Sequence, residues 1–179
     1  MPPFAIRPAR SADISALNAL IARSAAGLSA GFYSPQQVAA LARDVFGVDS
    51  QLVADGSYFV LEQDSVIAAC GGWSRRSTRF GGDNMKTVPD RLLDTACEPA
   101  RIRAFFVDPA SARRGYGSAL LAHCAAAAAA AGFTQLELVA TMPGVPLYQA
   151  HGFKEVERFD LRLENGAVAA PMALMRRAI

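Results

Sequence analysis

Two glycines near the middle of the chain, Gly115 and Gly117, have the spacing of an anion-binding loop. Glycine has no Cβ, so the backbone of such a loop can approach a ligand closely. The segment that follows is rich in alanine and leucine, which indicates a helix. The first N–H groups of a helix attract negative charge. With Arg113 and Arg114 alongside as counter-charges, the segment predicts a phosphate or pyrophosphate site.

Two regular elements must hold this loop in place. Residues 101–107 have the β-branched and aromatic content of a strand, and Asp108-Pro109 ends it. A helix is expected from Gly117 to Ala131, where Gly132 stops it. The stretch is therefore interpreted as strand, glycine loop and helix.

The segment from Ala112 to Gly117, Ala-Arg-Arg-Gly-Tyr-Gly, resembles the acetyl-coenzyme A signature of the GNAT N-acetyltransferases. The family pattern is Gln/Arg-x-x-Gly-x-Gly/Ala after an apolar strand, and Ala112 departs from its first position. A second segment, Pro146 to Phe153, resembles the family's late Leu-Tyr-x-x-x-Gly-Phe motif. The resemblance covers most of the chain, from the first strand to the last.

This resemblance implies acetyl-coenzyme A as co-substrate, with no metal, and it implies which residues bind it. In the family, pantetheine pairs with the strand before the glycine loop in the manner of β-augmentation. Tyr148 matches the family's general acid, because a phenol with a pKa of about 10 can give its proton to a thiolate of comparable basicity. The alternative for Tyr148 is a packed tyrosine in a short helix. The expected cofactor-binding residues are Phe105, Phe106, Val107, Arg113, Arg114, Gly115, Tyr116, Gly117 and Ser118.

A general base is not apparent in the sequence. Many relatives carry a glutamate on the strand before the glycine loop, where one such position holds Arg101 here. An alkyl amine with a pKa of ~10.4 is only roughly one part in a thousand neutral at physiological pH. A water chain, a weakly basic acceptor or an alkaline optimum would have to compensate. His123 and His151 are interpreted as surface or hydrogen-bonded residues.

Two aromatic residues are candidate acceptor contacts. Tyr33 lies between the first two expected helices and is expected to line the pocket because its hydroxyl needs a partner. The alternative is that it covers the core. Trp73 follows two glycines and is either a core residue or an aromatic wall for the acceptor.

Arginines are the other candidates for contact with an acceptor. The segment 75–99, which contains Pro89, is basic and irregular, and it either meets an acidic acceptor or is solvated surface. Arg101 and Arg103 alternate with Ile102 and are expected to share one face with Phe105. They either favour a carboxylate-bearing amine or are ion-paired structural residues.

Composition limits the remaining possibilities. The chain has 179 residues, 19% of them charged, and a net charge of +2, so it lacks the electrostatic footprint of a nucleic-acid or membrane surface. Three cysteines without metal-ligand spacing indicate free thiols in a reducing compartment and predict no metal site. No signal segment or apolar run of ~20 residues is present. We expect a cytoplasmic protein with a single domain over residues 1–179, compatible with a homodimer.

The pattern along the chain predicts an α/β fold in the order β-α-α-β-β-β-α-β-α-β-β. Ser11 and Ser34 are expected to cap the first two helices, and Asn165-Gly166 predicts the last hairpin. A mixed, largely antiparallel sheet with helices on both faces follows, which is also how the GNAT family is built. The expected strands span residues 4–7, 57–61, 66–70, 101–107, 135–141, 153–163 and 170–175.

These observations predict an N-acetyltransferase that moves an acetyl group from acetyl-coenzyme A to a primary amine of a small molecule, by direct attack in a ternary complex. A small molecule is favoured because segment 75–99 and the aromatic inter-helix loop suggest a covered pocket. Acetylation of a protein N-terminus or lysine is one alternative. A non-catalytic acyl-coenzyme A-binding regulatory module is another, but a sensor has no need of a thiolate acid such as Tyr148.

Overall fold

Seven strands form one sheet in the computed structural model, which describes residues 4–86 and 90–179. Their order across the sheet is β1-β2-β3-β4-β5-β7-β6. Only β4 and β5 run parallel, so the predicted mixed and largely antiparallel sheet is confirmed. The strands are β1 (Ala5–Pro8), β2 (Tyr58–Gln63), β3 (Val66–Ser74), β4 (Ala100–Val107), β5 (Gln135–Thr141), β6 (Lys154–Leu163) and β7 (Val168–Ala178).

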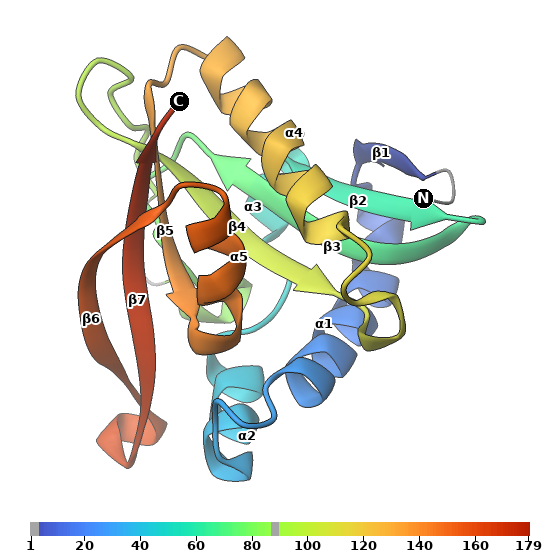
Figure 1. Ribbon diagram of the computed structural model, residues 1–179, viewed down its shortest axis with the longest axis vertical. Coiled ribbons are helices and arrows are strands. Elements are labelled where there is room, and N and C mark those ends of the chain that lie inside the picture. Colours follow the sequence, from blue (N-terminus) through green and yellow to red (C-terminus); the bar gives the residue numbers. More distant parts are fainter. Residues whose placement is uncertain (1–3, 87–89) are drawn as a thin grey trace.

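Helices cover both faces of this sheet (Figure 1). Side chains of α1 and α3 pack with Tyr58 and Val60 of β2, whereas those of α4 and α5 pack in the core that contains Phe59 and Leu61. Because successive side chains of a strand point to opposite faces, β2 needs an unbroken apolar run to serve both cores. The helices are α1 (Ile14–Leu28), α2 (Pro35–Asp44), α3 (Ser50–Ala54), α4 (Tyr116–Ala130) and α5 (Val145–Ala150).

The helix starts agree only partly with the sequence prediction. At α2 the predicted capping box is present, since the Ser34 hydroxyl accepts from the Gln37 N–H and the Gln37 side chain accepts from the Ser34 N–H. At α1 the expected Ser11 cap is wrong. Ser11 belongs to a short 3₁₀ turn, and the Asp13 carboxylate accepts the Arg10 N–H instead. The sequence pattern also did not predict the short helix that follows α2, residues Ser50–Ala54.

The strands β4 and β5 separate soon after they begin. Their ladder contains two residue pairs, Ala100 with Leu136 and Arg101 with Glu137. Figure 1 shows the two strands diverging toward their C-terminal ends. From Ile102 onward, β4 therefore has one edge that β5 does not pair.

A β-bulge in β4 changes which side chains face which core. The pairing with β3 shifts between Cys70 and Gly72, and Ala104 has a φ of 53°. As a result Phe105 packs in the same core as Ile102, while Arg103 points to the opposite face toward Asp49. The expectation that Arg103 shares a face with Phe105 is wrong, because the alternation on which it rested is interrupted at the bulge.

Candidate active site

Two adjoining cavities lie where β4 and β5 diverge. The larger has a volume of about 750 Å³ and is bounded by the end of α1, the C-terminal part of β4, the glycine loop, the start of α4 and α5. All of the residues predicted to bind the cofactor line this cavity, except Arg114. The Nη1 of Arg114 lies 3.5 Å from Oε1 of Gln63 on β2, so its guanidinium is turned away.

The glycine loop presents free backbone donors to the larger cavity. Gly115 has a φ of 79°, a conformation that residues with a Cβ rarely adopt. The first amide to find a helical partner is that of Ala119, which donates to the Gly115 carbonyl at 3.0 Å. The amides of residues 113–118 make no hydrogen bond to any residue that the structure describes. They form a cradle for an anion at the positive end of the α4 dipole.

Tyr148 stands at the junction of the two cavities, because it lines both. Its ring packs edge-on against Phe105, with centroids 6.4 Å apart, and against Phe153 at 5.8 Å. Burial raises the pKa of its phenol above the ordinary value of 10.0. Tyr148 is therefore a neutral proton donor in the physiological range of pH, placed on the wall of a cavity.

The smaller cavity has a volume of about 80 Å³ and continues from the larger one past Tyr148. Both cavities are lined by Phe46, Phe105, Phe106, Thr141 and Tyr148. The far end of the smaller cavity is formed by segment 75–99 together with β4 and β5. Its residues there are Arg79, Phe80, Gly81, Arg103 and Val139.

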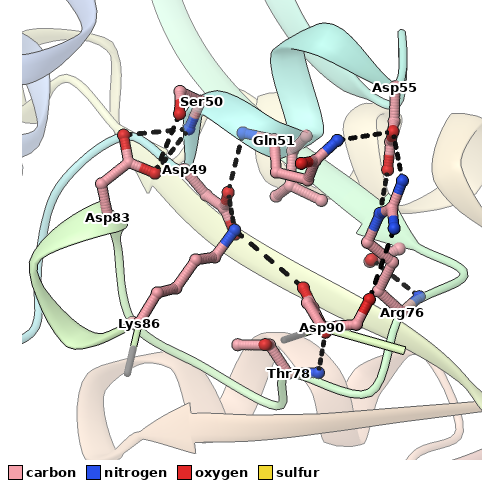
Figure 2. A network of polar contacts seen from close by, with 12 residues as sticks. Asp49, Ser50, Gln51, Asp55, Arg76, Thr78, Asp83, Lys86 and Asp90 are labelled. Atoms are coloured by element: carbon pink, nitrogen blue, oxygen red, sulfur yellow. Dashed lines mark hydrogen bonds and ion pairs between the residues drawn. The ribbon is translucent and has the colours of Figure 1, made fainter. Parts of the chain in front are cut away.

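Ion pairs and hydrogen bonds hold segment 75–99 against both ends of α3 (Figure 2). Arg76 binds the Asp55 carboxylate at 2.7 Å, Lys86 pairs with Asp49, and Asp83 accepts from the Ser50 N–H at 3.0 Å. The guanidinium of Arg76 lowers the pKa of Asp55. The described part of the segment is therefore a fixed wall of the smaller cavity, and Pro89 lies outside the described residues.

Arg103 anchors the same segment from β4. It donates to the carbonyl oxygens of Thr78 at 2.9 Å and Gly81 at 2.6 Å, and it pairs with Asp49 at 3.0 Å. Its side chain is almost fully buried, and burial lowers the pKa of its guanidinium. Of the two sequence interpretations of Arg103, the structure supports the ion-paired structural residue.

A second buried ion cluster surrounds Glu137 of β5. The Glu137 carboxylate is fully buried and contacts three guanidinium groups: Arg101 at 2.5 Å, Arg79 at 3.0 Å and Arg176 at 2.6 Å. Sequence reasoning missed Glu137, although a carboxylate inside the apolar run Gln-Leu-Glu-Leu-Val-Ala-Thr was a signal that it needs buried partners.

Both residues predicted to contact the acceptor, Tyr33 and Trp73, lie in the core. The Tyr33 hydroxyl donates to the Pro171 carbonyl at 2.7 Å and accepts from the Met142 N–H at 2.9 Å, so its hydrogen-bonding needs are met within the protein. Phe32, which is 50% exposed, lines the larger cavity in its place. Trp73 is buried against Phe133 and lines neither cavity. The candidate site therefore does not include Tyr33 or Trp73.

Among the described residues, no Asp, Glu or His side chain lines either cavity. His123 packs on Phe59 with ring centroids 4.4 Å apart, and His151 Nε2 lies 2.8 Å from the Ser118 hydroxyl. Glu62 and Glu98 pair with Arg7 and Arg91. The structure therefore offers no protein base beside Tyr148 within the part of the chain that it describes.

Within residues 4–86 and 90–179, no set of three or more His, Cys, Asp or Glu side chains is grouped so that it could hold a metal ion. None of the helices in them is both long enough and apolar enough to cross a membrane.

Comparison with known proteins points to one family. A family model described as an acetyltransferase (GNAT) domain matches residues 54–155, which is more than half of the chain. That range contains the glycine loop, β4 and Tyr148. No curated protein sequence matches the chain significantly.

Solved structures match the whole fold. A GCN5-related N-acetyltransferase structure from Rhodopseudomonas palustris superposes with a TM-score of 0.72 at 19% identity, covering 100% of this chain and 97% of that chain. The PaiA N-acetyltransferase of Thermoplasma acidophilum, solved with coenzyme A, has a TM-score of 0.67 at 14% identity, with 99% of both chains covered. The ribosomal-protein-S18-alanine N-acetyltransferase of Escherichia coli has a TM-score of 0.60 at 18% identity, covering 99% of this chain and 94% of that chain.

Proposed function

Because this chain belongs to the GNAT acetyltransferase family, we propose that it moves an acetyl group from acetyl-coenzyme A to a primary amine of a small molecule. The observation that carries the proposal is that one cavity combines a free anion cradle with a buried, protonated phenol. An acetyl donor with a pyrophosphate at one end and a thioester at the other needs both.

Coenzyme A fits the larger cavity on the evidence of its own residues. The free amides of residues 113–118 suit the pyrophosphate, and Arg113 adds a positive charge at the cavity wall. A Cβ added to Gly117 would lie 3.1 Å from Cδ2 of Leu147, which also lines the cavity, so glycine allows α4 and α5 to approach each other closely at the cavity wall. The unpaired edge of β4 from Ile102 onward can accept the peptide-like pantetheine arm. The fold relative PaiA was solved with coenzyme A.

The chemistry assigned to the protein is alignment, charge stabilisation and one proton transfer. As the acceptor nitrogen forms a bond to the thioester carbon, negative charge develops on the carbonyl oxygen. A free N–H of β4 can stabilise this charge by donating a hydrogen bond to the oxygen. The C–S bond then breaks, and Tyr148 gives its proton to the departing thiolate. The acceptor ammonium gives one proton to water before the attack, and the acetylated nitrogen gives up a second after it. One of these protons returns to Tyr148 through water, and the other is released.

The acceptor side favours a small molecule over a protein. The cavity beyond Tyr148 is about 80 Å³, and its far wall is held by Arg103 and the ion pairs of segment 75–99. A peptide chain would need a groove there. The fold relative from Escherichia coli is named as an N-acetyltransferase of an alanine in ribosomal protein S18, so peptides belong in the test.

Release of free coenzyme A thiol tests the proposal. The full chain is offered acetyl-coenzyme A with separate panels of small amines, amino acids and peptides, and acetylated products are identified by mass spectrometry. We expect turnover with small amines. Turnover with peptides alone would support the protein acetyltransferase, and tight binding without any turnover would support the regulatory module.

Arg113 and Arg114 should differ in their effect on cofactor binding. Arg113→Ala should weaken coenzyme A binding roughly tenfold, because a charge-assisted contact with a phosphate is lost at the cavity wall. Arg114→Ala, a matched control from the next position, should have a much smaller effect, since Arg114 is turned toward Gln63. Calorimetry with coenzyme A and with a dephosphorylated pantetheine fragment measures both. Equal losses for the two ligands would show that Arg113 has a structural role.

The rate should rise with pH across the neutral and mildly alkaline range. No described carboxylate or histidine lines the cavities, so the fraction of neutral acceptor amine sets the rate up to the amine pKa of ~10.4. Tyr148 does not oppose this rise, because burial keeps its pKa above 10.0 and the proton stays on the phenol. The measurement is kcat/KM for an alkyl amine against pH. A plateau reached near about pH 6.5 would instead indicate a dedicated base.

A further inference from the structure

We propose that the acceptor amine carries a carboxylate, which Arg79 binds at the far end of the smaller cavity. This inference rests on the proposed acetyl transfer and names its substrate class: a short aliphatic amino acid. It follows from the charges around Glu137, from the free donors of Arg79 and from the size of the cavity.

The cluster around Glu137 has more positive than negative charge. One carboxylate faces the guanidinium groups of Arg79, Arg101 and Arg176, and none of the three has a second ion-pair partner among the described residues. Glu98, the next acidic side chain near Arg101, is held by Arg91. A single carboxylate balances one of three cations, so the cluster can accept a further anion.

Arg79 is the member of the cluster that can reach a ligand. It lines the smaller cavity and its side chain is 51% exposed, whereas Arg101 is buried and Arg176 lines neither cavity. The Nε of Arg79 lies 3.0 Å from Oε1 of Glu137. The two terminal nitrogens of Arg79 make no hydrogen bond to any described residue, so they can bind a carboxylate in bidentate fashion.

Arg103 adds a positively charged side chain to the same end of the cavity. Its terminal nitrogens are used by Thr78, Gly81 and Asp49, but its Nε is buried and has no hydrogen-bond partner among the described residues. Arg103 also lines the cavity. The Nε is therefore covered by the protein and cannot contact a ligand, so Arg103 acts on an anion in the cavity through its charge.

The position of Tyr148 and the cavity volume limit the rest of the acceptor. The reacting amine must lie near Tyr148, where the two cavities meet, while the carboxylate lies at Arg79. The space between them is about 80 Å³ and has apolar walls, including Phe46, Val139 and Met172. Such a space suits a short hydrocarbon skeleton without further polar groups.

The test compares amino acids with matched amines that lack the carboxylate. Steady-state kcat/KM is measured with acetyl-coenzyme A for glycine, β-alanine and 4-aminobutyrate, and for glycinamide, ethylamine and propylamine. We expect the wild-type protein to prefer at least one of the acids. Arg79→Gln should lower kcat/KM for that acid about 10- to 100-fold, mainly through KM, and change the neutral amines less than about threefold.

Two further variants separate binding from structure. Arg176→Gln removes an equivalent partner of Glu137 without touching either cavity, so the preference for acids should persist. Arg79→Lys should restore part of the preference, since it keeps the charge and loses the bidentate geometry. Equal losses for acids and neutral amines in Arg79→Gln, or no preference in the wild-type protein, would overturn the inference and leave the acetyl transfer intact. Absence of turnover with every amine would overturn both.

Discussion

Replacing Tyr148 with phenylalanine is expected to lower turnover about 10²–10⁴-fold while folding and coenzyme A affinity persist. The substitution keeps the ring that packs against Phe105 and Phe153 and removes only the hydroxyl. That hydroxyl makes no hydrogen bond to a described residue, so its loss removes no structural contact in this part of the chain. The leaving thiolate then has to take its proton from water, which raises the barrier by ~3–5 kcal/mol.

Single-turnover and steady-state rates of thiol release measure this effect, with calorimetry for coenzyme A affinity. Tyr33→Phe is the matched control, because it also deletes a buried phenol hydroxyl, but one that binds Pro171 and Met142 outside the cavities. Tyr33→Phe should lower the free energy of unfolding and leave the turnover rate almost unchanged. A loss below about threefold in Tyr148→Phe would remove the residue from the mechanism.

Glu137→Gln is expected to destabilise the fold by about 3–5 kcal/mol. Glutamine keeps the shape of the side chain but cannot neutralise Arg101, which is buried, or the more exposed Arg79 and Arg176. The cluster joins β4, β5 and β7 at the point where the parallel ladder of β4 and β5 ends, so its loss also weakens the junction from which the two strands diverge.

Urea denaturation followed by circular dichroism measures the loss in free energy of unfolding. Glu155→Gln is the control, because Glu155 forms an exposed ion pair with Arg158 on β6, and such pairs contribute about 0–1 kcal/mol. A loss in Glu137→Gln no greater than that of the control would mean that Arg101 is solvated without the carboxylate, contrary to its burial.

The sequence by itself determined most of the elements and the strand, loop and helix around the glycine loop. Local rules were sufficient for three features. Ser34 and Gln37 lie three residues apart and cap α2. Asn165-Gly166 lies in the turn that connects β6 to β7, and Gly115 adopts the positive φ that favours glycine. In each case the interacting groups are neighbours along the chain. Helix α3 was missed because five residues are too few to show a helical period, and its cap by Asp49 is the only local signal.

The tertiary structure decided which side chains face the cavities. One additional residue at the Ala104 bulge separates Arg103 from Phe105, and no local pattern announces it. Tyr33 finds its partner at Pro171, and Arg101 finds Glu137, across long stretches of chain. Whether a polar side chain is left for a ligand depends on whether a distant residue satisfies it first. That depends on long-range packing, and for this reason Tyr33 belongs to the core while Arg79 retains donors that reach the smaller cavity.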